Sequence, residues 1–407
     1  MMFFQLAWRN VWRNPRRTVI ILMAVTVAVW SMIISSALMR GIADQLVRNG
    51  IATLTGHIQI HERGYRNDPA VELRIKDPGA LHSTLKQCVP PGALSADRVR
   101  VNAIASNARH SEGITLVGID PDRERNVSFV ARSITSGNYL HPDDEYGVLI
   151  GKALMDKLET RVGRKLILMS QDTQKEIASR AFRISGVFRA DLEATERQYV
   201  FITLSAATGM LKMERSLSEV CVVLPDRAGV EGTAARLRAV LPSSYEVHTW
   251  QELLPLATAM LKMYESLIYL WYLVAFMAMG FGIVNTILMA VLERTREFGL
   301  LRALGMKPGW IVREVLTESL LLLVMGAVLG NCLGMLSVAA LSHTGIDLSL
   351  LAGGTKTFGL PRVIYPAVLM SDAVLANGIV VALGLVVSAY PAVKASRFTP
   401  VKAMAHT

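Results

Sequence analysis

Only a few residues in this chain have the types and spacing that metal binding or catalysis requires. His57 and His61 lie on one face of a presumed strand, with Glu62 beside them, and imidazole and carboxylate groups are common zinc ligands. No third ligand stands at a useful spacing. The pattern is also that of ordinary exposed strand histidines, and we assign no metal ligand.

Two other stretches contain groups that could act on a substrate. Asp143-Asp144-Glu145 follows a proline and is typical of a solvated turn. Gly147–Ala153 (GVLIGKA) contains a Gly-Lys pair, but a phosphate-binding loop also needs Ser or Thr after the lysine and a glycine where Tyr146 stands. The G-x-S-x-G motif of serine hydrolases does not occur. We therefore expect no catalytic residue, no nucleotide site and no cofactor in this chain.

The most informative pattern lies in residues 293–306, ERTREFGLLRALGM. This stretch joins two long apolar runs, residues 267–292 and about 311–341. Its apolar residues follow three- and four-residue spacing, which predicts a short amphipathic helix. The residues with this spacing are Phe298, Leu301 and Leu304/Gly305.

The surroundings of this expected helix allow two interpretations. Gly299 and Gly305 bracket it, Arg302 lies on another face, and the KPG sequence at 307–309 stops it. A short helix between two membrane spans suits the transmission of a push from a soluble partner to both spans. A basic cytoplasmic loop that only sets membrane topology explains the same residues. From the residues alone both interpretations stay open.

The composition divides the chain into a membrane part and a water-soluble part. Of its 407 residues, 52% are hydrophobic and 19% are charged, which is too apolar for an ordinary soluble protein and too charged for one that is all membrane. Residues 42–262 contain 28 of the 43 basic and 26 of the 33 acidic residues, so most of the net charge of +10 belongs to the apolar remainder. This distribution argues against a nucleic-acid surface.

Four apolar runs are each long enough to span a hydrocarbon core of about 30 Å. Trp and Arg side chains before the first run predict an interfacial helix on the inner leaflet, separated from the span by Pro15. Twelve of the 15 basic residues outside the domain lie in the N-terminal segment, the loop around 293–309 and the tail, whereas Arg40, Lys356 and Arg362 lie on the other side. The positive-inside rule then places both ends in the cytoplasm. The expected segments are 1–17 interfacial helix, 18–41 first span, 42–262 external domain, 263–292 stalk and second span, 293–309 short cytoplasmic helix, 310–341 third span, 342–371 outer loop, 372–393 fourth span and 394–407 cytoplasmic tail.

The domain over residues 42–262 contains two similar βαβ segments. Each has a strand, a helix with an Asp at its N-cap and a Pro after it, and a second strand. Together they predict one small α/β sandwich of the split-βαβ kind, with a β-rich insertion at about 113–213. The expected fold class is therefore α+β, with four transmembrane helices and a large α/β domain between the first two. The strands expected are 57–61, 99–105, 114–119, 165–169, 182–188, 199–202, 219–224 and 245–249, and the helices begin at 78, 151 and 227, with a further helix running unbroken from Trp250 into the second span.

Small and polar residues within the apolar runs predict contacts between helices. Gly326, Gly330 and Gly334 recur every four residues and let another helix approach closely, either in this chain or in a second subunit. Asn285 and Asn331 are expected to donate interhelical hydrogen bonds. No regular series of charged groups follows the spans, which argues against an ion channel or a proton relay.

Glu318 lies about two turns inside the third expected span. A buried carboxylate there needs a partner, and Arg294 and Arg302 stand near the same boundary. The alternative is a glutamate at the interface that reaches water. Both interpretations stay open.

The three cysteines, Cys88, Cys221 and Cys332, show no metal or redox spacing. Cys88 and Cys221 could form a disulfide if they lie outside the cytoplasm. We expect isolated packed thiols instead.

At this point the sequence resembles a known family. ERTREFGLLRALGMKPGWIVREVLTESLLLLVMGAVLG is similar to the signature segment of FtsX-like, MacB-type ABC transporter permeases. The tail PAVKASRFTPVKAM resembles their closing motif, with Pro391, Ala395, Arg397 and Pro400 at the usual spacing, and LAWRNVWRNPRRT resembles their N-terminal segment. TGHIQIHERGY, LVGIDP and GVLIGKALMDKL look most like the lipoprotein-releasing permeases of the LolC/LolE type.

The resemblance implies a multi-pass protein of the bacterial inner membrane with a periplasmic domain. It implies two permease subunits, alike or different, and a dimer of a separate cytoplasmic ATPase that holds ATP and Mg²⁺. On this basis Leu301→Arg or Gly299→Trp is expected to abolish ATP-coupled activity without affecting the fold. The residues implied to dock the ATPase are Glu293, Arg294, Glu297, Phe298, Gly299, Leu300, Leu301, Arg302, Ala303, Leu304, Gly305 and Met306.

The implied activity is mechanical transmission of ATP hydrolysis to the periplasmic side, with no hydrophilic channel, to extract or export a lipoprotein or another amphipathic substrate. In lipoprotein-releasing permeases a longer hairpin loop recruits a carrier protein, whereas residues 170–180 here (SQDTQKEIASR) are short and polar. Two alternatives therefore stand: an FtsX-like regulator of a periplasmic partner such as a cell-wall hydrolase, and the permease of an adaptor-dependent export system. The expected partners are thus the ATPase, a second permease, a periplasmic carrier or adaptor and membrane lipid.

Overall fold

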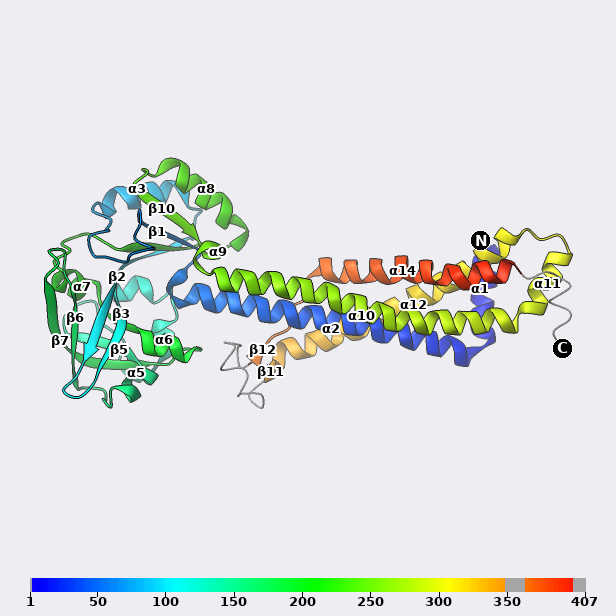
Figure 1. Ribbon diagram of the computed structural model, residues 1–407, viewed down its shortest axis with the longest axis horizontal. Helices are drawn as coiled ribbons and strands as arrows, with labels where there is room; N and C mark the ends of the chain where they lie inside the picture. Colours follow the sequence, from blue (N-terminus) through cyan, green and yellow to red (C-terminus); the bar gives the residue numbers. More distant parts are fainter. Residues whose placement is uncertain (1, 348–362, 398–407) are drawn as a thin grey trace. The chain divides into compact units, whose positions relative to one another are not determined.

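The structure is a computed structural model that describes residues 2–347 and 363–397 (Figure 1). Its internal contacts divide the chain into two compact units. Of the described residues, 2–45, 260–347 and 363–397 form a helical unit, and 46–259 form an α/β unit. Lys356, Arg362 and Pro400, which the sequence singled out, lie outside the described residues.

The helical unit contains four helices that are long and apolar enough to cross a membrane, within the part of the chain that the structure describes. Proline is the first residue of three long helices, a position where its missing N–H has no intrahelical partner to lose. The first span continues as one helix to Gly50, so its last turn belongs to the α/β unit. The elements are α1 (Met2–Arg13), α2 (Pro15–Gly50), α10 (Pro255–Glu293), α11 (Thr295–Ala303), α12 (Pro308–Thr344) and α14 (Met370–Ser396), with the strand pair β11 (Ile346–Asp347) and β12 (Val363–Ile364).

The repeated glycines of α12 form a contact face for α2. A Cβ atom added at Gly326, Gly330 or Gly334 would lie 2.6, 2.7 or 2.9 Å from the nearest side-chain atom of α2. These atoms belong to Val25, Val29 and Ile33. The predicted packing face is thus confirmed, and its partner is a helix of the same chain.

Asn331 makes the interhelical hydrogen bond expected of it. Its Nδ2 donates to Oδ1 of Asn377 in α14 at 2.8 Å, and Asn377 Nδ2 donates back to Asn331 Oδ1 at 3.0 Å. The same expectation was wrong for Asn285, which is exposed on α10 and has no hydrogen bond to another helix within the described ranges. The two asparagines differ because Asn331 lies on a side of its helix that faces α14, whereas Asn285 lies on an exposed side of α10.

The α/β unit is built on one mixed sheet with the strand order β10-β1-β9-β2-β3-β8-β5-β7-β4, and β6 pairs with β2 and β7. The first four strands of this order, together with helices α3 and α8, form the expected split-βαβ platform. Asp77 caps α3, as predicted, by accepting a hydrogen bond from the amide of Ala80. The strands are β1 (Ile58–Glu62), β2 (Leu94–Ser106), β3 (Ser111–Ile119), β4 (Ile134–Gly137), β5 (Gly147–Gly151), β6 (Lys165–Gln171), β7 (Ile177–Phe188), β8 (Tyr199–Thr203), β9 (Glu219–Val223) and β10 (Tyr245–Thr249).

Short helices connect these strands. α3 and α8 lie against each other, and α5 lies against α6. Asp226 caps the short η3 helix just before α8, where the sequence placed the start of α8 itself. The helices are η1 (Ile51–Thr55), α3 (Pro78–Cys88), α4 (Pro121–Glu124), η2 (Val130–Ser133), α5 (Lys152–Lys157), α6 (Glu193–Gln198), α7 (Leu204–Met210), η3 (Arg227–Gly229), α8 (Val230–Val240) and α9 (Trp250–Leu253).

The β-rich insertion continues the sheet of the platform, because β2 is long enough to pair with β9 through Leu94–Arg98 and with β3 through Arg98–Ser106. One expectation about the end of this unit was wrong. The helix after Trp250 is not continuous, because Leu254 leaves the helical conformation before Pro255. The residue before a proline is restricted away from the helical region, and this explains the break.

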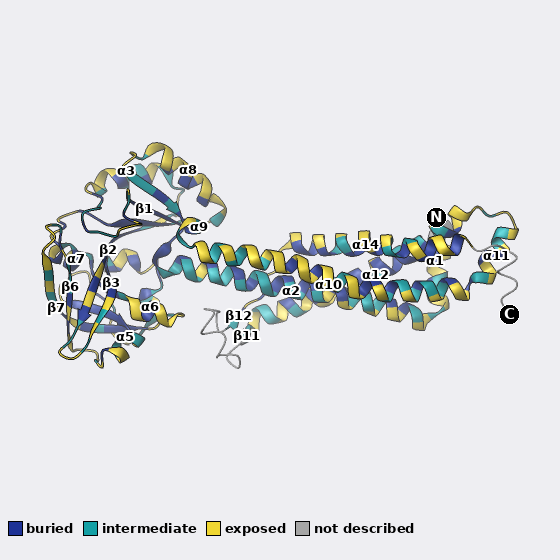
Figure 2. Cartoon of the chain, in the orientation of Figure 1, coloured by how far each residue is buried: buried dark blue, intermediate teal, exposed yellow. Residues whose placement is uncertain are grey.

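Both faces of the central strands are buried (Figure 2). On β3, Leu116 lies in one apolar cluster with Val148 and Ile202, whereas the neighbouring Val117 lies in a second cluster with Phe188. Successive residues of a strand point to opposite faces, so the sheet has a core on each side. The second core also contains Leu54 of η1.

Candidate functional site

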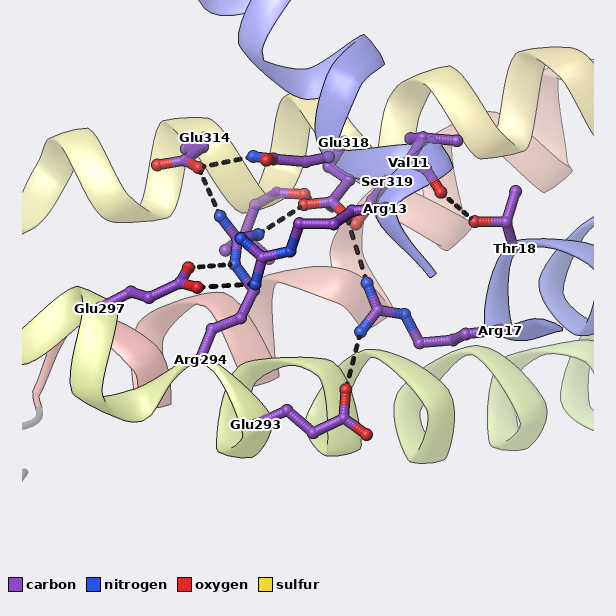
Figure 3. Close-up of polar contacts among 12 residues, drawn as sticks. Val11, Arg13, Arg17, Thr18, Glu293, Arg294, Glu297, Glu314, Glu318 and Ser319 are labelled. Atoms are coloured by element: carbon purple, nitrogen blue, oxygen red, sulfur yellow. Dashed lines mark hydrogen bonds and ion pairs between the residues drawn. The ribbon is translucent and has the colours of Figure 1, made fainter. Parts of the chain in front are cut away.

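The turn between α10 and α11 is organised around the side chain of Arg294, which is 8% exposed. Its three guanidinium nitrogens each contact a different carboxylate: Nη2 lies 2.9 Å from Glu314, Nε 3.1 Å from Glu297 and Nη1 3.2 Å from Glu318 (Figure 3). The guanidinium carbon also lies 5.0 Å from the ring centroid of Phe298. A planar guanidinium can satisfy several acceptors at once, so one side chain connects α11 to α12.

Two arginines near the start of the chain complete this group. Arg13 Nη2 lies 2.7 Å from Glu297, and Arg17 lies 3.4 Å from Glu293 and 3.5 Å from Glu318 (Figure 3). The sequence positions of Arg17 and Glu318 differ by 301. We call the set the Arg294 cluster; its members are Arg13, Arg17, Glu293, Arg294, Glu297, Glu314 and Glu318.

Burial divides the cluster into a core and a rim. The side chains of Arg294, Glu318, Arg17 and Glu314 are 10–15% exposed, whereas those of Arg13, Glu293 and Glu297 are 46–55% exposed. Exposed pairs contribute about 0–1 kcal/mol, but removing one partner of a buried pair costs about 3–5 kcal/mol. The core of the cluster therefore holds the helices together.

The contacts within the cluster also change the pKa of Glu297, one of its exposed members. Burial raises the pKa of Glu297, but hydrogen bonds from Arg13 and Arg294 outweigh this effect, so the pKa lies below its usual value. Glu297 is thus ionised at neutral pH and joins α1 to α11.

A cavity of about 20 Å³, which is room for about one water molecule, lies beside Glu318, Arg17 and Arg294.

The sequence identified part of this arrangement. Arg294 was a candidate partner of Glu318 and is confirmed, whereas Arg302 is not its partner. Arg302 Nη1 instead donates to the carbonyl of Ser396 at 2.5 Å, at the end of α14. Arg17 was missed; the available signal was that Arg13 and Arg17 stand one helical turn apart just before the first span.

Helix α11 buries one side and exposes the other. Phe298 and Gly299 are buried and Leu301 is half-buried, whereas Leu300 and Leu304 are 62% and 78% exposed. Leu304 was expected on the same face as Phe298, and this was wrong because α11 ends at Ala303.

One of the two glycines of this segment also differs from the expectation. Gly305 has a φ of +92° and follows the end of α11, as expected for a helix-terminating glycine. Gly299 does not end the helix but lies in its middle. Leu301→Arg and Gly299→Trp would therefore disturb packing inside this chain as well as any partner contact.

The residues considered for catalysis have structural contacts. His57 Nδ1 accepts a hydrogen bond from the amide of Leu224 at 2.9 Å, and His61 stacks on Tyr65 with ring centroids 5.2 Å apart. Both histidines are buried, so the expectation of exposed strand histidines was wrong. The GVLIG stretch forms β5, and Lys152 after it pairs with Asp156 at 2.6 Å.

All three cysteines are free thiols. Cys221 is buried, as expected of a packed thiol, and burial raises its pKa to about 12.

A second, smaller charged group joins other parts of the bundle. Arg40 of α2 contacts both carboxylate oxygens of Asp372 in α14, at 2.9 and 3.1 Å, and lies 3.4 Å from Glu265 in α10. Tyr272 of α10 donates to the carbonyl of Asp372 at 3.4 Å. This group was not foreseen, since its residues are 332 and 225 positions apart.

Two protein families match this chain. Residues 18–240 match the MacB-like periplasmic core domain, and residues 269–400 match the FtsX-like permease C-terminal family. The chain is 23% identical over 402 residues to the lipoprotein-releasing system transmembrane protein LolC of Xylella fastidiosa, covering 94% of this chain and 91% of LolC. It is 26% identical over 425 residues to the pyoverdine export ATP-binding/permease protein PvdT of Pseudomonas aeruginosa, covering 98% of this chain but 58% of PvdT.

Two solved structures match about half of this chain. The periplasmic region of MacB from Actinobacillus actinomycetemcomitans matches at 13% identity and a TM-score of 0.35, covering 51% of this chain and 95% of that one. The extracellular domain of the ABC-type transporter YknZ matches at 14% identity and a TM-score of 0.34, covering 48% of this chain and all of that one. From the two family matches, the chain belongs to the FtsX/MacB-type ABC transporter permeases and is a multi-pass membrane protein with a MacB-like periplasmic domain between its first two long apolar helices.

Proposed function

We propose that α11 is the helix through which this permease binds a separate cytoplasmic ATPase, the subunit that holds ATP and Mg²⁺. The observation that carries the proposal is an exposed surface formed by Arg296, Leu300 and Ala303 of α11 and by Leu304, which directly follows it. Exposed leucines beside charged residues are typical of a protein contact. The basic residues at 9–17, 294–313 and 394–402 support a cytoplasmic position for this end of the chain.

The contacts behind α11 give a physical route for transmission. Arg294 joins α11 to α12, Arg13 joins it to α1, and Arg302 joins it to α14. Arg17 of α2 pairs with Glu293 at the end of α10 and with Glu318 of α12. A displacement of α11 therefore acts directly on α12 and α14 and, through the Arg294 cluster, on α2 and α10. This supports mechanical coupling of ATP hydrolysis to the periplasmic domain.

The substrate that we propose is a lipid-anchored or otherwise amphipathic molecule handled at the outer face of the membrane. Among the described residues between the Arg294 cluster and the Arg40–Asp372 group, the polar links from one helix to another include the Asn331–Asn377 pair and single hydrogen bonds of Ser, Thr and Trp side chains, with no charged pair. Such an interior gives a hydrophilic solute no continuous polar path. A second permease subunit, alike or different, would complete the transporter.

The hairpin between β6 and β7 helps to decide which kind of periplasmic partner to propose. Its turn spans five residues, Asp172–Glu176, and Asp172 is held by Lys212 at 2.7 Å. The turn itself is polar, and the exposed Ile177 lies just beyond it, at the start of β7. The short turn favours an adaptor or a differently docked carrier over recruitment by a long loop.

The test is affinity purification of the tagged full chain in mild detergent, followed by identification of bound protein and lipid. Leu304→Arg should lose the ATPase and its stimulation, whereas Leu304→Met, which keeps the apolar contact, should retain both. Equal ATPase recovery with Leu304→Arg, or no ATPase with the unmodified chain, would refute the proposal. Recovery of a cell-wall hydrolase without any lipid or lipoprotein would assign the regulatory function instead.

A further inference from the structure

The α/β unit contains an arginine with no solvent exposure at all. Arg98 of β2 donates to both carboxylate oxygens of Glu124 in α4, at 2.7 and 3.0 Å, and to Glu219 of β9 at 3.1 Å. Both glutamates are also completely buried. Removing three charges from water is costly, and in some proteins a buried ionic group of this kind specifies one conformation.

The third acceptor of Arg98 explains what is specified. Arg98 Nη1 donates to the backbone carbonyl of Leu54, and Gln59 Nε2 donates to the same oxygen at 2.9 Å. Leu54 lies in η1, the short segment that follows α2, and has φ +66° and ψ −8°. A leucine rarely adopts this left-handed conformation, so surrounding contacts must hold it.

Other contacts hold the same segment against the sheet. The amide of Phe129 donates to the carbonyl of Ala52 at 3.2 Å. Gly56 has φ +64°, and a Cβ there would lie 2.2 Å from the sulfur of Cys221 in β9. The side chain of Leu54 is buried in the second core of the sheet. These contacts hold residues 52–56 in one conformation against the sheet.

The charges of the group balance. Arg100 Nη1 lies 3.8 Å from the second oxygen of Glu219, so two arginines face two glutamates. Burial raises the pKa of Glu219, but Arg100 and Arg98 outweigh this and hold it below its usual value. Glu219 is therefore ionised at neutral pH.

We propose that Arg98 is a positioning residue that locks the turn at Leu54, so that a displacement of α2 is delivered to the periplasmic sheet rather than absorbed at a flexible joint. The lock acts in η1, directly after the last turn of α2, and both of these segments belong to the α/β unit. The transmission part of this inference rests on the proposed ATPase coupling, whereas the local lock does not.

The test compares two variants of the full chain in detergent by hydrogen exchange. Arg98→Met/Glu124→Gln removes one positive and one negative charge and leaves Arg100 with Glu219. Exchange of amides 51–57 should then rise roughly tenfold or more, the factor expected on losing a charge-assisted hydrogen bond. Glu124→Gln alone keeps the donor to Leu54 and should leave this segment protected.

If Arg98 only stabilises the fold, protection from hydrogen exchange should instead fall uniformly over the whole α/β unit in both variants. Equal protection of residues 51–57 in the double variant and the unmodified chain, or a uniform loss in both variants, would overturn the lock. If the double variant does not fold, Gln59→Leu removes the other donor to Leu54 without changing a charge. It should raise exchange over the same residues, and unchanged exchange would count against the lock.

A second measurement separates this inference from the proposed function. With the ATPase bound, nucleotide should alter exchange in the periplasmic sheet of the unmodified chain but not of Arg98→Met/Glu124→Gln, while ATPase recovery stays equal. Failure of the unmodified chain to bind an ATPase refutes the proposed function and leaves the local measurement decisive for Arg98. If nucleotide alters exchange in the double variant as much as in the unmodified chain, transmission through Arg98 is refuted.

Discussion

Replacing Glu318 by Gln removes a negative charge that Arg294 and Arg17 share, at 3.2 and 3.5 Å, and keeps the shape of the side chain. The Glu318 side chain is 12% exposed, so water compensates little. Hydrogen bonds to charged groups contribute about 1.5–3 kcal/mol. In this variant Arg294 still pairs with Glu314 and Glu297. The loss of stability is therefore smaller than the cost of leaving a buried arginine without any carboxylate partner. We expect the free energy of unfolding to fall by about 1–3 kcal/mol.

The measurement is unfolding in mixed micelles titrated with SDS, together with ATPase stimulation. Glu293→Gln is the matched control, because Glu293 also pairs with Arg17, at 3.4 Å, but is 46% exposed. Its change should not exceed about 1 kcal/mol. If Glu318→Gln and Glu293→Gln behave alike, or if stability and ATPase stimulation are both unchanged in Glu318→Gln, charge pairing at Glu318 is unimportant and the assignment of a cluster core is wrong.

Three further predictions concern other parts of the chain. Gly330→Val should weaken α2–α12 packing by about 1–3 kcal/mol in the same micelle assay, whereas Gly378→Val, at an open position, should be close to neutral. A double-mutant cycle with Asn331→Ala and Asn377→Ala should give a coupling energy of about 0.5–2 kcal/mol, and an energy near zero would contradict the reciprocal bond. Burial lowers the pKa of His61 to about 4, so below pH 6.5 the unfolded chain binds a proton that the folded chain does not. Stability of the α/β unit should therefore fall by about 3 kcal/mol from this group between pH 6.5 and 4, and His61→Phe, measured by urea unfolding, should remove that part of the slope.

Local patterns predicted most of the elements. The apolar runs predicted four spans because a helix needs about 20 apolar residues to cross a membrane, and the residue pattern located β10 at its observed bounds, Tyr245–Thr249. The Asp77 cap was also predictable, since it involves residues three positions apart. The pattern missed β5, whose GVLIG sequence is buried throughout and has no alternation.

Contacts between distant residues were beyond such reasoning. The sequence singled out Glu318 as a carboxylate that needed a partner, but it could not identify Arg17, or exclude Arg302, because the helix packing decides which arginine reaches it. The exposed face of α11 was likewise misjudged at Leu304, because the helix ends one residue earlier.

Hydrophobic length and periodicity, which are properties of short stretches, already determine that this chain crosses a membrane several times and has an α/β domain after its first span. The charged groups that join its helices, and the buried Arg98 that holds the carbonyl of Leu54, exist only in the folded molecule. Their members come from elements far apart in the chain, and a guanidinium finds its acceptors only where packing of those elements brings carboxylates within about 3 Å and removes the competing water.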